Sequence, residues 1–188
     1  MRRISDSLSW PAWLAVFLLL PWISGCANNP ANDRPQDADL VAASYAAAEK
    51  LVESSQVPLT PGRNIMMATF VSIDSLENSS SLGRIIAEQV SSRLTQMGFT
   101  MIELKLRDNI FIKQSEGEFM LSRELRSISH GHDAQAVVTG TYAVGQDAVF
   151  VNARVIRPQD SVILSSYDYV LPLGRNTKTL LRRASSTY

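Results

Sequence analysis

The sequence predicts an α/β (α+β) fold: a single small domain with a mixed β-sheet. Three observations predict it. The 188 residues suffice for one compact unit with tails, at about 100–200 residues per domain. A β-type run, an amphipathic helical segment and a second β-type run come one after another, which indicates a β-α-β unit with parallel strands. Three later β-rich runs with short connections indicate an antiparallel three-strand meander.

The first 25 residues have the pattern of an export signal. Arg2 and Arg3 precede an apolar run over residues 12–20. This run is shorter than the roughly 20 apolar residues that a spanning helix needs, and Pro21 interrupts its continuation into Trp22 and Ile23. We therefore expect a cleaved signal peptide over residues 1–25 rather than a permanent membrane span.

A four-residue box ends this segment and resembles the bacterial lipobox: Ile23, Ser24, Gly25 and Cys26. In a lipobox, small residues admit the peptidase and the cysteine thiol receives a diacylglycerol group. The alternative is a conventional secretory signal with a free cysteine. We predict lipidation of Cys26, which also accounts for the single cysteine of the chain. By resemblance to lipoproteins in general, Ala27, which is not an aspartate, favours the outer membrane.

The remaining chain divides into a tether, a domain and a tail. Residues 26–36 contain two prolines and no large apolar side chain, so we predict a lipidated N-terminus and a flexible tether. The folded domain is expected over residues 37–175. A tail with a basic pair of arginines is expected over residues 176–188.

The first half of the domain contains two helical and two β-type segments. Residues 37–54 place apolar side chains at helical spacing, with acidic residues at the start, where a helix dipole favours them. Residues 64–74 form a near-continuous apolar run, which is typical of a strand covered on both faces. Residues 79–98 begin with serine N-caps, carry one apolar stripe and end at Gly98, which indicates a second helix. Residues 100–106 are expected to form the next strand.

The second half of the domain is predicted to be mostly strand. A short third helix is expected over residues 116–129. Strands are expected over 136–144, 148–156 and 162–171. In the middle strand the valines fall on one face, while Asn152 and Arg154 fall on the other, so we expect one covered and one wetter face. For these two residues, a partner surface and a simple cross-strand polar pair are both open.

The composition argues against nucleic-acid binding and against most enzyme classes. Lys plus Arg number 18 and Asp plus Glu number 18, so no net charge draws the chain to nucleic acid. The chain has two histidines, and it contains neither a Gly-x-Ser-x-Gly elbow nor a Ser-x-x-Lys pair. We therefore predict no catalytic residue, no enzymatic activity and no cofactor.

Two clusters have some ligand-binding character. His130, His132 and Asp133 can share a metal, but a closed structural zinc site takes four ligands, and a solvated turn after the third helix is favoured. Residues 79–81 precede a helix N-terminus and are candidates for an anion site. They lack the glycine and lysine of a P-loop, so ordinary N-capping is favoured.

Three sequence blocks resemble the FlgO domain, over about residues 51–173. They are Ser81–Arg84 running through Met97–Phe99 to Glu103, then Gly117–Arg123, and finally Gly140–Tyr142 followed by Val151–Val155. FlgO-type proteins are outer-membrane lipoproteins associated with the flagella of Gram-negative bacteria. Their fold is similar to the small α/β unit at the N-terminus of TolB and to that of the lipoprotein LpoB, which activates a cell-wall synthase.

The resemblance implies a non-enzymatic outer-membrane lipoprotein, whose domain faces the periplasm and supports flagellar assembly, stability or motility. Its partners would be the outer membrane, through the lipid, and flagellar basal-body or other envelope proteins. A homo-oligomer is a further expectation. The alternatives are an LpoB-like regulator of a periplasmic cell-wall enzyme and a metal- or small-ligand-binding envelope lipoprotein. The residues alone predict a tethered, nearly neutral module that binds no nucleic acid.

Overall fold

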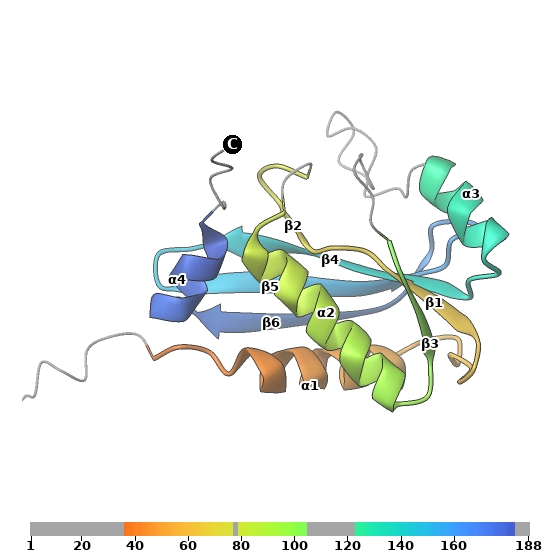
Figure 1. The fold of residues 1–188 in the computed structure, drawn as a ribbon, viewed down its shortest axis with the longest axis horizontal. Coiled ribbons are helices and arrows are strands. Elements are labelled where there is room, and N and C mark those ends of the chain that lie inside the picture. The colour runs from red at the N-terminus through yellow and green to blue at the C-terminus, as the bar shows by residue number, and fades with distance from the viewer. Residues whose placement is uncertain (1–35, 77–78, 105–122, 183–188) are drawn as a thin grey trace, which may run out of the picture. The chain divides into compact units, whose positions relative to one another are not determined.

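The computed structural model describes residues 36–76, 79–104 and 123–182. These ranges form one mixed sheet of six strands with four helices (Figure 1). The strand order is β3-β1-β4-β5-β6, and the short strand β2 also pairs with β4. The small α+β domain predicted from the sequence is confirmed.

Three strands build the parallel half of the sheet. They are β1 (Asn64–Met67), β3 (Thr100–Glu103) and β4 (Ala136–Val144). Ile65 pairs in parallel with Met101 on one side and with Ala136 on the other. The parallel β-α-β unit is therefore confirmed. Strand β3 ends at Glu103, and residues 105–106 of the predicted strand lie outside the described ranges.

The other half of the sheet is the antiparallel meander. Strand β5 spans Ala148–Ile156 and strand β6 spans Ile163–Pro172. Val151 in the middle of β5 pairs with Tyr142 of β4 and with Tyr169 of β6. Because each connection is short, neighbouring strands run in opposite directions. The three predicted strands match these within one residue at each end.

The apolar run predicted as one strand over residues 64–74 is interrupted. After β1, residues 68–70 stand opposite only residues 139–140 of β4, and pairing resumes in β2 (Val71–Ser72). The extra residue bends the chain like a β-bulge. Phe70 turns fully into the core, and a Cβ at Gly140 would lie 2.2 Å from the Phe70 ring. Glycine at position 140 therefore makes room for the bend.

Helices α1 (Leu40–Glu53) and α2 (Ser81–Gln96) pack on one face of the sheet, where α2 crosses the strands in Figure 1. Arg93 Nε of α2 donates a hydrogen bond to Glu49 Oε1 of α1 at 2.8 Å. The main core lies between these helices and the sheet, and its fully buried members include Leu51, Ile65, Phe70, Leu82, Ile86 and Val90.

The helix ends match the sequence signals with one shift. Helix α1 begins at Leu40, not at residue 37, because Asp39 is its N-cap and accepts a hydrogen bond from Ala42 N at 3.0 Å. Helix α2 has Ser80 as its N-cap and is followed by Gly98 at φ 92°, the left-handed conformation that favours glycine.

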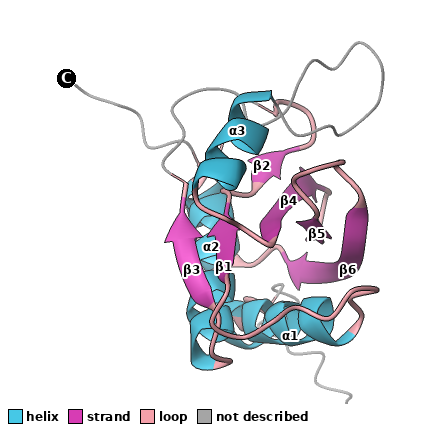
Figure 2. Ribbon diagram, turned by 90° about the vertical axis from the view of Figure 1, so that its right-hand side faces the viewer, coloured by secondary structure: helices cyan, strands magenta, loops and turns pink. Residues whose placement is uncertain are grey.

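Helix α3 (Arg123–Gly131) contacts the opposite face of the sheet, and Figure 2 shows α1 and α3 on opposite sides of the strands. Its Leu125 is fully buried in a second, smaller core with Met66, Val137 and Ile156. The first part of the predicted third helix, residues 116–122, lies outside the described ranges. At its other end the helix continues to Gly131, so His130 belongs to the helix and not to the turn after it.

Helix α4 (Arg175–Leu181) lies where the sequence predicts a tail. Its first turn is held by Asp37, whose Oδ1 accepts from Asn176 N at 2.8 Å and from Thr177 N at 3.3 Å. Asp37 thus caps a helix near the C-terminal end of the sequence instead of starting α1. Such a long-range cap leaves no local sequence signal, which explains why α4 is missed.

Candidate interaction surface

The predicted lipidation site lies outside the described residues. This holds for Cys26, for the rest of the box at Ile23, Ser24 and Gly25, and for the tether up to residue 35. Lipidation of Cys26 and cleavage before it therefore stay predictions. Among the described helices, none has the length and apolar character that a membrane crossing requires.

Strand β5 presents two different faces, as the sequence predicts. Val149, Val151, Ala153 and Val155 are buried under α1 and α2. The residues between them point to the other face, where Phe150 is 55% exposed. Because side chains alternate along a strand, one strand contributes both to the core and to an open surface.

Three exposed apolar side chains gather at one end of this second face. Phe150 of β5 pairs with Ala143 of β4 and with Val170 of β6, so Ala143, Phe150 and Val170 lie in one row across the sheet. Ile73 adjoins the row, because its N–H donates to the Tyr142 carbonyl at 2.9 Å. Ile73, Phe150 and Val170 are 45, 55 and 54% exposed. We call these three residues the apolar patch.

The apolar patch borders a shallow hollow of about 300 Å³. Thr141, Asn152 and Asp168 line it beside the patch, and they form the next row across the same strands. The Asn152 side-chain amide donates to Asp168 Oδ1. This is the cross-strand polar pair that the sequence leaves open for Asn152.

The polar row retains unused hydrogen-bonding capacity. Within the described ranges, Asn152 Oδ1 is buried and has no hydrogen-bond partner, and the same holds for Thr139 Oγ1 on the same face. A buried acceptor without a partner costs about 1–3 kcal/mol. The acceptor of this row that a partner's donor can reach is the carboxylate of Asp168, which is exposed. An apolar row next to such a polar row is typical of a protein interaction site.

The candidate metal residues lie at the end of α3. His130 is in the last turn of the helix, and His132 and Asp133 come after it; all three are exposed. Asp133 Oδ1 lies 3.6 Å from Arg63 Nη2, and Asp133 has a positive φ of 47°. In the part of the chain that the structure describes, no three His, Cys, Asp or Glu residues are grouped to hold a metal ion.

The serines before α2 act as a helix cap. Ser80 Oγ accepts from Gly83 N at 3.2 Å, and Ser79 Oγ donates to the Phe70 carbonyl at 2.9 Å. The Phe70 carbonyl also fills the space beside Gly83, where a Cβ would lie 2.1 Å from it. The N-capping role favoured by the sequence is confirmed, and these contacts fix α2 against the bend before β2.

Sequence reasoning misses the apolar patch as a whole. The alternation in residues 148–156 places Phe150 on the face of Asn152 and Arg154, so this one member has a local signal. Ile73 and Val170 belong to other segments, and only the pairing of β2, β4, β5 and β6 brings them beside Phe150.

Comparisons with known proteins agree with this architecture. The family model described as FlgO protein matches residues 45–176. The LpoB C-terminal domain from Salmonella enterica superposes with a TM-score of 0.50 at 16% identity, covering 70% of this chain and 97% of that one. The corresponding domain from Escherichia coli gives 0.49 at 15%, covering 73% and 99%. At such identities the likeness concerns the fold. No curated protein sequence matches significantly.

Proposed function

Because the chain belongs to the FlgO family, we propose that it is a non-enzymatic outer-membrane lipoprotein that supports the flagellum through protein contacts. The family match begins within α1 and ends at the start of α4, so it contains all six strands together with α2 and α3. The apolar patch is the observation that carries the interaction role. It exposes two large apolar side chains on the sheet face and a third, Ile73, in the turn after β2, where a partner can bury them.

The proposed anchor is the lipid on Cys26. Each buried acyl CH₂ contributes about 0.8 kcal/mol, so several chains hold a protein on a bilayer more firmly than one does. The tether residues after it reach about 30 Å when extended, at about 3.3–3.6 Å per residue. The domain then faces the periplasm at a distance that clears the lipid headgroups.

The proposed docking site is the apolar patch together with the polar row at Asn152 and Asp168. Full burial of a valine, isoleucine or phenylalanine side chain contributes about 1.5–3 kcal/mol. Since the three patch residues are about half exposed, their burial supplies a few kcal/mol. This suits a basal-body component of the flagellar envelope that presents an apolar side chain flanked by a hydrogen-bond donor.

A motility experiment tests this function. Deletion of the gene is expected to reduce swimming in soft agar, and the wild-type chain to restore it. Phe150→Asp places a charge in the patch and is expected to fail to restore swimming at normal protein levels. Val57→Asp is the matched control, because Val57 is 46% exposed outside the patch. Normal swimming of the deletion strain would refute the flagellar role.

A second candidate function is regulation of a periplasmic cell-wall enzyme. Its support is the likeness of the fold to the LpoB domain, nearly all of which is matched. A pull-down from solubilised envelopes separates the two functions. Recovery of a cell-wall synthase in place of basal-body proteins, lost in Phe150→Asp, would favour this second function.

A further inference from the structure

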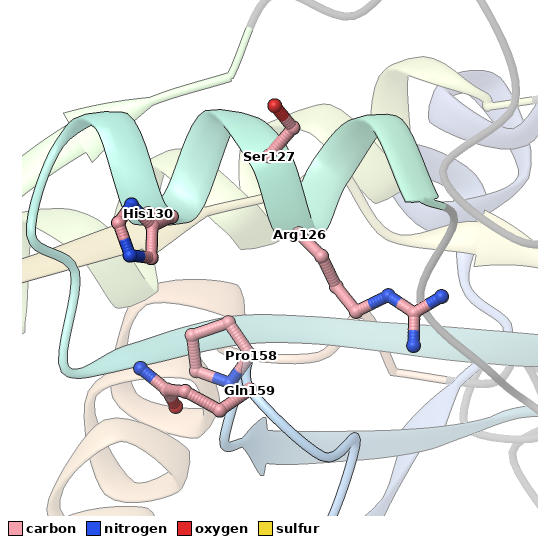
Figure 3. Close-up of a pocket in the computed structure, with 5 residues that line it drawn as sticks. All are labelled: Arg126, Ser127, His130, Pro158 and Gln159. Atoms are coloured by element: carbon pink, nitrogen blue, oxygen red, sulfur yellow. The ribbon is translucent and has the colours of Figure 1, made fainter.

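A cavity of about 410 Å³ lies between helix α3 and the turn that connects β5 with β6, away from the apolar patch. Its lining is Arg126, Ser127 and His130 from the helix and Pro158 and Gln159 from the turn (Figure 3). The Ser127 hydroxyl points away from the turn in this view. The other polar side chains of the lining are Arg126, His130 and Gln159, and in Figure 3 the Arg126 guanidinium extends towards the N-terminal end of α3, away from the other two.

The packing of α3 directs its basic residues to this cavity. Leu125 is fully buried against the sheet, and Ser129 Oγ donates to the Leu125 carbonyl at 2.7 Å, so this side of the helix is occupied. Arg126 and His130 are four residues apart and therefore lie one above the other on another side of the helix. The side of α3 that carries Arg126 and His130 contributes nothing to the core and lines the cavity.

Among the described residues, no acidic group neutralises the cavity. None of the described side chains that line it is a carboxylate. The nearest acid in sequence is Asp160, which already accepts from Arg157 Nε at 2.9 Å and lies 2.8 Å from Arg157 Nη2. The hydrogen bond from Arg157 holds the pKa of Asp160 below its usual range, so this carboxylate stays ionised and paired. Within the described ranges, Arg126 takes part in no ion pair.

The carbonyl groups at the end of α3 are also occupied. The carbonyls of Ile128, Ser129 and His130 accept from the backbone N–H groups of residues 132, 134 and 133 at 2.9–3.1 Å. These three carbonyls at the negative end of the helix therefore already have donors. The polar side chains that line the cavity are thus an arginine, a histidine and a glutamine.

We propose that this cavity binds a phosphate group. A carboxylate has two oxygens and is satisfied by one guanidinium, whereas a phosphate offers three or four oxygens to donors from different directions. Here the donors come from two elements: Arg126 and His130 from the helix, and Gln159 from the turn. The Arg126 side chain is long and has no ion-pair partner among the described residues. It can therefore rotate towards a bound phosphate, and the only cost is the conformational entropy of the side chain.

Two sources of phosphate fit this chemistry, a free phosphate monoanion or dianion and the phosphodiester headgroup of a lipid. The probes are inorganic phosphate and the soluble diester glycerophosphoglycerol. Each is titrated into the full-length ¹⁵N-labelled chain in a phosphate-free detergent, with sodium chloride at equal ionic strength as the blank. Tighter binding of the diester identifies a lipid headgroup, and tighter binding of inorganic phosphate identifies a free phosphate.

The expected result is a saturable shift of the Arg126 side-chain and His130 signals. Loss of a hydrogen bond to a charged group predicts that Arg126→Gln weakens binding by about tenfold or more. Arg175→Gln is the matched control, since Arg175 is an exposed helical arginine far along the chain, and its affinity should stay within about twofold. Shifts that do not saturate, that chloride reproduces, or that survive Arg126→Gln with unchanged affinity overturn the proposal.

Discussion

The two faces of strand β5 have opposite surroundings. On one face, four alternate residues from Val149 to Val155 are at most 2% exposed under α1 and α2. On the other face, Phe150 is 55% exposed between Ala143 and Val170. One strand therefore serves two purposes. Its buried side supplies stability, and the part of the other side around Phe150 is exposed, so it can take a partner without loss of the fold.

From this contrast we expect substitutions on the covered face to reduce the stability of the fold, and substitutions on the exposed part of the other face to reduce only binding. Residues one position apart in the sequence are expected to behave in opposite ways. The expected loss of stability is largest for Val151 on the covered face. It is smaller for Gly140 and Ser80, which position the elements around that face, and smallest for the exposed Phe150.

The largest effect is expected for Val151→Asp on the covered face. A carboxylate at this fully packed position is buried among apolar side chains without a partner, which costs several kcal/mol. Since small domains are stable by about 5–15 kcal/mol, we expect most of the stability to be lost. Urea denaturation followed by circular dichroism measures it. A loss below about 1 kcal/mol would mean that this face is not the core.

A smaller loss is expected for Gly140→Ala, because Gly140 lies directly against the Phe70 ring in the core. A Cβ at Gly140 would lie 2.2 Å from the Phe70 ring and 2.6 Å from the Asn152 carbonyl oxygen. Gly140→Ala should therefore cost about 1–3 kcal/mol, because the ring and a backbone strand must shift. Gly131→Ala is the control, since no atom lies within 4 Å of the added carbon. Equal melting temperatures for the two variants would contradict the packing of Phe70 against β4.

A loss of about 1 kcal/mol is expected for Ser80→Ala. The substitution removes the cap that Ser80 Oγ gives to Gly83 N at the start of α2, one of the two helices that cover the buried face. Ser80→Asp preserves an acceptor at this position and serves as the control. The free energy of unfolding from denaturant titration should fall for alanine and be restored by aspartate, and a similar loss in both variants would argue against the cap.

The smallest effect on stability is expected for Phe150→Ser on the open face. The side chain is half exposed, so we expect a change of about 0.5–1 kcal/mol, far less than for Val151→Asp next to it. Denaturant titration of both variants measures the difference. Binding should show the opposite order, because Phe150 is the centre of the apolar patch. If Phe150→Ser unfolded the domain as Val151→Asp does, the two faces would not be distinct.

Much of this contrast is readable in the sequence. The alternation of valines with Asn152 and Arg154 predicts two different faces, and the turns at residues 145–147 and 157–161 fix the three strands within one residue. The N-cap at Ser80 and the glycine at position 98 bound α2 as predicted. These features are local, so local patterns suffice to find them.

What the sequence does not predict depends on contacts between distant segments. The break after β1 arises because Phe70 enters the core opposite Gly140, which belongs to a strand much later in the chain. Helix α4 begins where Asp37, which lies 139 residues before Asn176 in the sequence, accepts the Asn176 N–H. The apolar patch joins the segment after β2 to β5 and β6 through strand pairing alone. No window of sequence contains these pairs.

If the proposed function holds, the exposed part of the sheet face around Phe150 contacts a protein of the flagellar envelope. Photo-cross-linking in living cells, with a photoreactive residue at position 150 or at position 57, tests it most directly. We expect adducts with basal-body proteins from position 150 and none above background from the similarly exposed position 57. Adducts with these proteins from position 57 alone, or from neither position, would contradict it.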